Sequence, residues 1–112
     1  MIPRLATSVW VGALLRRADV GGVFGAVLRK GDPVAGAVIL IARAPGGEAS
    51  VWTRVAQGEA SVWAEAMRAD GKESPRIEEY VARQARYDPD LWLVELITKE
   101  IQPLIADVSR SI

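Results

Sequence analysis

The stretch Val-Ala-Gly-Ala-Val-Ile-Leu-Ile-Ala, residues 34–42, is the longest apolar run in the chain that contains no more than one glycine. It is far shorter than the roughly 20 apolar residues that a helix needs to span a bilayer. A short run that is apolar at every position is typical of a central strand covered on both faces. We therefore expect a sheet built outward from this segment.

Further short runs rich in valine and tryptophan lie on both sides of it, at residues 24–29, 49–55 and 60–66. The residues between the runs are turn formers, such as Lys30-Gly31-Asp32-Pro33. Short apolar runs bounded by glycine and proline favour strands joined by tight turns. The four runs are predicted to form a meander.

The hexapeptide Gly-Glu-Ala-Ser-Val-Trp occurs twice, at residues 47–52 and 58–63. A solenoid would need at least three longer units, so we interpret the repeat as two similar adjacent strands. On a hairpin, Trp52 and Trp63 could lie on one face. There they would either fill the gap beneath a helix or form an exposed aromatic platform for binding.

Helices are predicted before and after the strand-rich region. Thr7 or Ser8 suits the N-cap of a first helix, which Gly21-Gly22 would end. Ser74-Pro75 supplies an N-cap and a first-turn proline for a second helix, and Pro89 cannot continue it.

A last strand is expected at residues 91–96, and residues 98–112 would form either a short helix or an arm that docks on a neighbour. These elements predict an α+β fold with a mainly antiparallel sheet of about five strands. The four-strand meander would be joined by the last strand, and two helices would pack on one face. We expect one domain, residues 1–112, with its core at about residues 7–97.

The composition excludes several classes of chemistry because the chain has no cysteine and no histidine. Thiol nucleophiles, Ser-His-Asp triads, histidine bases and zinc sites with thiolate or imidazole ligands are therefore ruled out. No cofactor is implied. The N-terminal segment lacks the pattern of a secretory signal, so a cytoplasmic location is expected.

An enzyme would need carboxylates and a hard metal ion. Asp88, Asp90 and Glu95 are candidate ligands for magnesium or manganese. Glu65 and Glu95 are a second candidate set, as an acid/base pair on two strands. The simpler interpretation of Asp88-Pro89-Asp90 is a helix stop followed by a turn.

Charge is unevenly distributed along the chain. Residues 1–58 carry seven lysines and arginines against three acids, whereas residues 59–112 carry seven against eleven. A phosphate-binding surface could draw on Trp52 and on the basic residues of the first half: Arg16, Arg17, Arg29, Lys30, Arg43 and Arg54. Alternatively, the two halves interleave in one domain and neutralise each other, which we favour because a single sheet would scatter these side chains.

Gly31 and Gly36 have the spacing that opens a phosphate-binding P-loop. Ala37-Val38 stand where lysine and serine or threonine would be required, and a strand is expected to follow instead of a helix. We therefore interpret Gly31 and Gly36 as part of a hairpin turn.

Three groups of residues resemble a family of short bacterial proteins known as a domain of unknown function, number fourteen-ninety-one. They are Trp10 with Ala13–Arg17, Arg29–Asp32 leading to Ala35–Ala37, and Ala82–Trp92 with Glu95. The likeness covers most of residues 7–97, and its last motif is the most specific. It implies a small stand-alone bacterial protein and supplies no catalytic or binding residues.

The leading functional hypothesis is a non-enzymatic interaction or assembly module, expected as a homodimer, with an unidentified protein partner and no membrane. It rests on the four tryptophans, the zero net charge and the absence of a convincing catalytic set. The candidate interaction residues are Arg83, Arg86, Asp88, Asp90, Trp92, Trp52 and Arg54. The alternatives are weak nucleic-acid or phosphate-ligand binding through the basic N-terminal half, and a carboxylate/divalent-metal enzyme.

The junction at residues 83–92 distinguishes a site from a structural turn. In a helix stop, Asp88 should accept hydrogen bonds from nearby backbone amides and Trp92 should be buried. In a site, the side chains of Arg83, Arg86 and the two aspartates should converge on a concave surface with Trp92 as one wall. The helix stop is the expected outcome.

Overall fold

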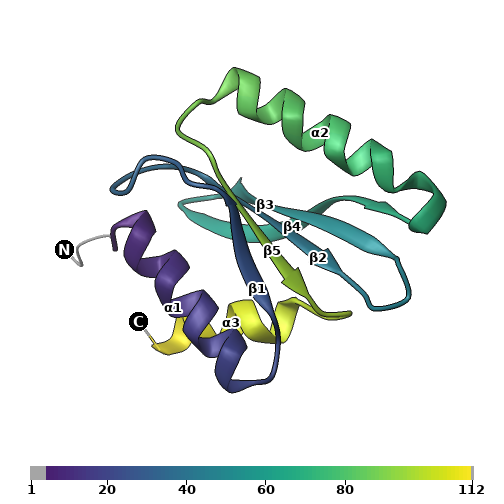
Figure 1. The fold of residues 1–112 in the computed structure, drawn as a ribbon. Coiled ribbons are helices and arrows are strands. Elements are labelled where there is room, and N and C mark those ends of the chain that lie inside the picture. Colours follow the sequence, from purple (N-terminus) through teal and green to yellow (C-terminus); the bar gives the residue numbers. More distant parts are fainter. Residues whose placement is uncertain (1–4, 112) are drawn as a thin grey trace.

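The computed structural model describes residues 5–111, in which a five-stranded sheet is covered by helices on both faces (Figure 1). In chain order the elements are α1 (Thr7–Val20), β1 (Gly25–Arg29), β2 (Val38–Arg43), β3 (Ala49–Gln57), β4 (Ala60–Ala69), a 3-10 turn η1 (Gly71–Glu73), α2 (Ser74–Tyr87), β5 (Trp92–Ile97) and α3 (Gln102–Ser111). The α+β class predicted from the sequence is confirmed.

The strand order is β1-β5-β2-β3-β4, so the sheet is mixed. Strands β2, β3 and β4 form the predicted antiparallel meander. The expected fourth member, β1, is separated from β2 by β5, which is antiparallel to β1 and parallel to β2. The four-strand meander is therefore wrong. The reason is burial. Strand β5 has buried apolar side chains on both faces and belongs inside the sheet, whereas β1 exposes side chains in its middle and suits an edge.

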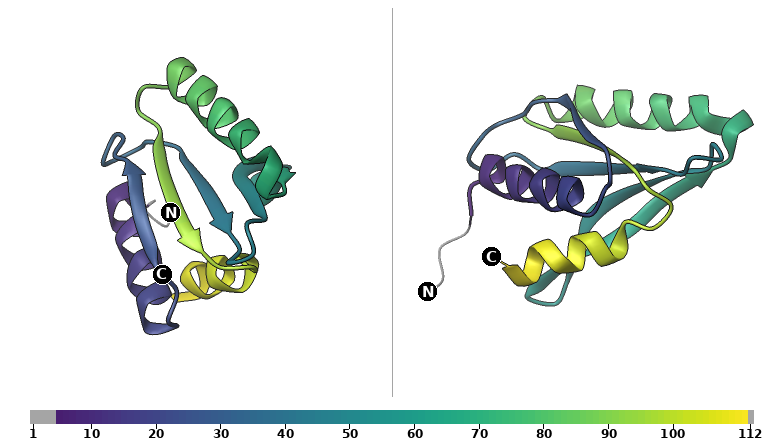
Figure 2. Two further views of the ribbon diagram at one scale, coloured as in Figure 1. Left: turned by 45° about the vertical axis from the view of Figure 1, so that its right-hand side comes forward. Right: turned by 60° about the horizontal axis from the view of Figure 1, so that its bottom comes forward.

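Helices cover the two faces separately, which corrects the prediction of two helices on one face. Figure 2 shows α1 and α3 on one side of the sheet and α2 on the other. In β2, Leu40 and Ala42 belong to the core beneath α1 and α3, and Ile39 and Ile41 belong to the core beneath α2. A central strand that is apolar at every position needs cover on both faces.

Both predicted N-caps differ in the structure. The N-cap of α1 is Ala6, and the Thr7 hydroxyl instead donates to the carbonyl of Gly36 at 2.8 Å. Ser74 is already helical, because the Asp70 carboxylate caps the preceding turn by accepting from the amides of Lys72 and Glu73. The Thr7 hydroxyl thus forms a long-range hydrogen bond instead of capping α1, and Asp70 caps the turn before α2 in place of Ser74.

The C-terminal segment forms α3, so the short-helix alternative holds for residues 102–111, while Ile112 lies outside the described residues. Ile101, Ile105 and Val108 join Val11 and Leu14 of α1 in the core of that face. Across residues 5–111, no helix combines the length and apolar character needed to cross a membrane.

Candidate functional site

The loop between β1 and β2 crosses over the start of β5 at very short range. A Cβ atom on Gly31 or Gly36 would collide with the backbone carbonyl of Asp90. Only glycine permits two backbones to approach so closely. The predicted hairpin turn is therefore wrong here: these glycines let the loop pass over a neighbouring strand.

Asp32 attaches this crossing loop to the start of β5 through hydrogen bonds. Its amide donates to the carbonyl of Asp90 at 3.0 Å, and its own carbonyl accepts from the Trp92 indole Nε1 at 2.7 Å. The Asp32 carboxylate also accepts from the amides of Val34 and Ala35 at 3.2 and 2.8 Å. Two of the three groups of residues that carry the family resemblance thus meet here: Arg29–Asp32 with Ala35–Ala37, and Ala82–Trp92. Their contacts at this crossing are structural.

The junction at residues 83–92 has the contacts expected of a helix stop. The Asp88 carboxylate accepts a hydrogen bond from the Asp90 amide at 3.0 Å. Trp92 is buried, and its indole donates to the Asp32 carbonyl. Arg83 and Arg86 are exposed on α2 and form no ion pair with any residue from 5 to 111. These side chains do not gather around a shared pocket.

The carboxylates proposed as metal ligands are not brought together. Within residues 5–111, no three acidic side chains are placed to hold a metal ion. Glu95 lies in β5, five residues after Asp90 of the preceding turn, and its carboxylate accepts a hydrogen bond from Arg43 instead. Glu65 and Glu95 point to opposite faces, because Glu65 pairs with Trp52 and Glu95 with Ile41. Both carboxylate sets proposed for an enzyme are therefore wrong.

Arg43 connects three elements on the α2 face. Its Nε lies 2.6 Å from the Glu95 carboxylate of β5, and its Nη2 lies 2.5 Å from Glu78 of α2. The hydrogen bond to Glu95 raises the pKa of Arg43, burial opposes the rise, and Glu78 adds to it. The arginine charge is therefore balanced inside the protein.

The other basic residues of the N-terminal half are dispersed over both faces. Arg17 of α1 pairs with Asp107 of α3 at 3.9 Å, and Arg29 donates to the carbonyl of Pro89 at 3.1 Å. Arg54 stands over the ring of Trp63 at 5.7 Å from its centroid. Four of the six residues of the predicted phosphate-binding surface, Arg17, Arg29, Arg43 and Arg54, are thus each in contact with a partner elsewhere in the protein.

Trp52 and Trp63 lie on the same face of the hairpin, as predicted. Trp63 stacks on Trp10 of α1, with ring centroids 5.3 Å apart and planes inclined by 18°. Trp52 is buried under the start of α3. Both rings therefore fill space beneath helices, and neither forms an exposed aromatic platform.

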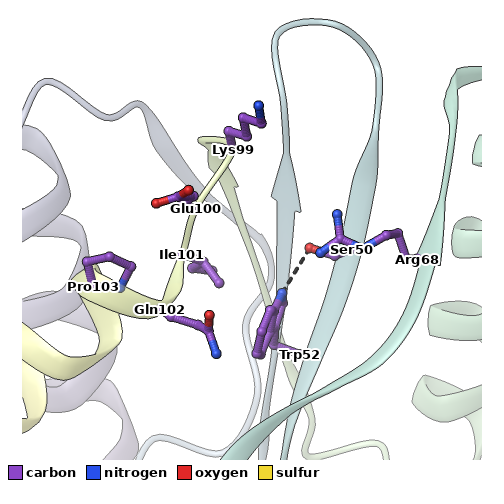
Figure 3. Close-up of a pocket in the computed structure, with 8 residues that line it drawn as sticks. All are labelled: Ser50, Trp52, Arg68, Lys99, Glu100, Ile101, Gln102 and Pro103. Carbon is purple, nitrogen blue, oxygen red and sulfur yellow. Dashed lines mark hydrogen bonds between the residues drawn. The ribbon is translucent and has the colours of Figure 1, made fainter.

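A cleft of about 580 Å³ opens beside Trp52, between the β3–β4 pair and the segment that leads into α3 (Figure 3). Eight residues line it: Ser50, Trp52, Arg68, Lys99, Glu100, Ile101, Gln102 and Pro103. Sequence reasoning named Trp52 alone among them. Ser50 belongs to the same repeated hexapeptide as Trp52, the others carry no motif, and only the packing of α3 brings residues 99–103 opposite the sheet.

Arg68 is held in place on the β4 side of the cleft. Its guanidinium forms ion pairs with Glu48 and, at 2.6 Å, with Glu65. The hydrogen bond to Glu48, followed by that to Glu65, raises the pKa of Arg68. This arginine is exposed, so the pairs orient the guanidinium more than they stabilise the fold.

A separate surface feature lies along β1. Phe24, Leu28 and Val27 expose 69%, 53% and 40% of their surface. Within residues 5–111, β1 pairs with β5 alone, so its other edge is open. An open edge with apolar side chains is a common template for pairing with another strand.

Comparisons with known proteins agree on one family. The model of the family described as "Protein of unknown function (DUF1491)" matches residues 5–106. A crystal structure of a DUF1491 family protein from Caulobacter crescentus CB15 is 38% identical, with a TM-score of 0.78, covering 87% of this chain and 91% of that chain.

Two solution structures are also similar. An NMR structure of a DUF1491 family protein from Caulobacter crescentus CB15 is 38% identical, with a TM-score of 0.74 and coverage of 86% of this chain and 87% of that one. Protein Atu0922 from A. tumefaciens is 31% identical, with a TM-score of 0.76 and coverage of 91% and 92%. The comparison with curated proteins finds no match.

Proposed function

This chain belongs to the DUF1491 family of proteins of unknown function, and from that premise we propose that it is a non-enzymatic interaction module that forms a homodimer through β1. The observation that carries the proposal is the open edge of β1 with its exposed Val27 and Leu28. As its setting we propose the cytoplasm, the location expected from the sequence.

The two edges of the sheet differ in a way that favours β1. Strand β4, at the other edge, carries Glu65 and Arg68, and charged side chains are a usual protection against edge pairing. Strand β1 has one charged residue, Arg29, at its end, and that guanidinium is already bonded to Pro89. Pairing at β4 would crowd charges, whereas pairing at β1 would cover apolar surface.

A second copy of the chain suits β1 as the partner. Antiparallel pairing about a two-fold axis sets each Arg29 near the partner's Gly25, so like charges do not face each other. Such pairing would join two five-stranded sheets into one. Because the strand is short, the buried area is small and we expect a dimer with a dissociation constant of about 1–100 µM.

The interaction residues predicted from the sequence lie elsewhere. Arg54, Arg83, Arg86 and Asp90 are exposed, and they remain candidate contacts for an additional protein partner. Trp52 and Trp92 are buried, so neither offers surface to a protein partner.

Light scattering over about 10–500 µM protein tests the dimer. We expect the apparent mass to rise from one to two chains across this range, and Val27→Lys to remain monomeric with an unchanged melting temperature. Val55→Lys is the matched control, because Val55 is a strand valine on the β3–β4 hairpin with a similar exposure of 43%. It should dimerise normally. A wild-type protein that stays monomeric, or a Val27→Lys variant that dimerises, would refute the proposal.

A further inference from the structure

We propose that two arginine–aromatic contacts hold the β1 dimer together, each with Arg29 of one copy over the Phe24 ring of the other. The inference rests on the proposed homodimer and names the side chains that select a second copy as the partner. Two features that the single chain leaves unexplained carry it: an exposed phenylalanine at one end of β1 and an arginine without an acidic partner at the other.

Phe24 immediately precedes β1 and is 69% exposed. Its carbonyl accepts from the Ile97 amide at 2.9 Å, so it extends the pairing of β1 with β5 by one residue. The next residue, Gly25, pairs with Leu96, which lies in the core beneath α1 and α3. Because side chains alternate along a strand, Phe24 lies on the opposite face of the sheet, which is the face that α2 covers.

On that face α2 does not extend over β1. The core beneath α2 takes residues from β2, β3, β4 and β5, and within residues 5–111 it takes none from β1. The Phe24 ring is therefore uncovered in the single chain. A buried aromatic side chain removes roughly 150–250 Å² from water. Two such rings would add substantially to the small area that the paired strands bury by themselves.

Arg29, at the other end of β1, lies on the same face, because it pairs with Leu93 of the core beneath α2. Its Nη2 donates to the carbonyl of Pro89 at 3.1 Å, and its Nε is buried without an acceptor among the described residues. Arg29 forms no ion pair with any residue from 5 to 111. The guanidinium is thus fixed in place, with no carboxylate paired to it in this part of the chain.

Antiparallel pairing about a two-fold axis at Val27 brings the two features together. Arg29 then lies opposite the partner's Gly25, which has no side chain, and one residue along the strand from the partner's Phe24. At strand spacing the Cα atoms of Arg29 and that phenylalanine are about 6 Å apart, so both side chains can reach the contact. A guanidinium within about 6 Å of a ring centroid is attracted to the face of the ring.

Sedimentation equilibrium of the full chain over about 10–500 µM measures the contact through the dissociation constant of the dimer. Phe24→Leu keeps an apolar side chain and removes the ring. It should weaken the dimer about five- to thirtyfold, because each dimer loses two cation–π contacts. Phe24→Trp should tighten the dimer about two- to fivefold, because indole binds cations best among the aromatic side chains. Both variants should keep the wild-type melting temperature, because the side chain is exposed in the monomer.

Arg29→Met keeps the buried stem of the side chain and removes its charge. In this background Phe24→Leu should weaken the dimer by at most about twofold more, because the contact is already lost. Arg54→Met is the matched control. It removes an arginine that stands over Trp63 within the same chain, on β3, which β5 and β2 separate from β1. It should leave the dissociation constant unchanged.

The outcomes separate this contact from the dimer itself. A wild-type protein that stays monomeric at about 500 µM would refute both. If the wild type dimerises and Phe24→Leu dimerises equally well, the strand pairing stands and the arginine–aromatic contact is wrong. The contact is also wrong if Phe24→Leu weakens the dimer by the same factor with and without Arg29→Met, because residues in contact give non-additive effects.

Discussion

At the residue scale, the crossing between the β1–β2 connection and the start of β5 explains why particular residue types are needed. The residues concerned are Gly31, Gly36, Asp32 and Trp92. The two glycines leave room for the Asp90 carbonyl, and Asp32 and Trp92 bond across the same contact. In the sequence, glycine beside aspartate and proline indicates only a turn. The structure shows that the same residues join the β1–β2 connection to β5.

Gly36→Ala should lower the free energy of unfolding by about 1–3 kcal/mol, because the added Cβ would press on the backbone at Asp90 and Asp32. Gly12→Ala is the control, since its Cβ would meet no atom within 4 Å and α1 should gain about 0.5–1 kcal/mol. Urea denaturation of both variants measures these changes. Equal stability of Gly36→Ala and the wild type would show that the crossing is not tight.

At the scale of elements, α2 is attached to the sheet by two kinds of contact. Ile77 and Val81 pack on the apolar face, and Glu78 reaches Arg43 at the end of β2. The sequence predicts the helix and its apolar stripe, but Arg43 was assigned to a basic surface. An arginine 25% exposed between two carboxylates instead serves as a cross-link between helix and strands.

Arg43→Gln should destabilise the protein by about 1–2 kcal/mol, because it leaves the half-buried Glu95 without its cation. Arg76→Gln removes a matched surface pair with Glu73 and should cost at most about 0.5 kcal/mol. A raised pKa of Arg43 contributes stability that is complete below the ordinary arginine pKa and is lost only above it. The difference between Arg43→Gln and the wild type should therefore be constant from about pH 7 to 9 in urea denaturation. A loss no greater than that of Arg76→Gln would contradict the cross-link.

At the scale of the molecule, one sheet carries two cores. Leu40 and Val94 point to α1 and α3, while Ile41 and Leu93 point to α2. Because the two cores share their strands, neither should remain ordered when the other is lost. We therefore propose that the chain unfolds as one cooperative domain.

Ile105→Val and Ile77→Val test this proposal, one in each core. Each should cost about 0.5–1.5 kcal/mol, and the double variant should show their sum within about 0.5 kcal/mol. Thermal unfolding followed by far-UV circular dichroism and by tryptophan fluorescence should give one midpoint for every variant. Two separate midpoints would mean that the helices on the two faces unfold independently.

Local pattern was enough to locate most elements, because side-chain periodicity and turn residues act over a few neighbours. The run at 34–42 indicated a doubly covered central strand, and Pro89 marked the end of α2. Strand order, the face that each helix covers, and the cleft beside Trp52 depend on contacts between residues far apart in the chain. Many strand orders bury the same apolar residues, and only the tertiary structure selects β5 for the position between β1 and β2. That insertion leaves β1 as an open edge, and the packing of α3 places Lys99 opposite Arg68.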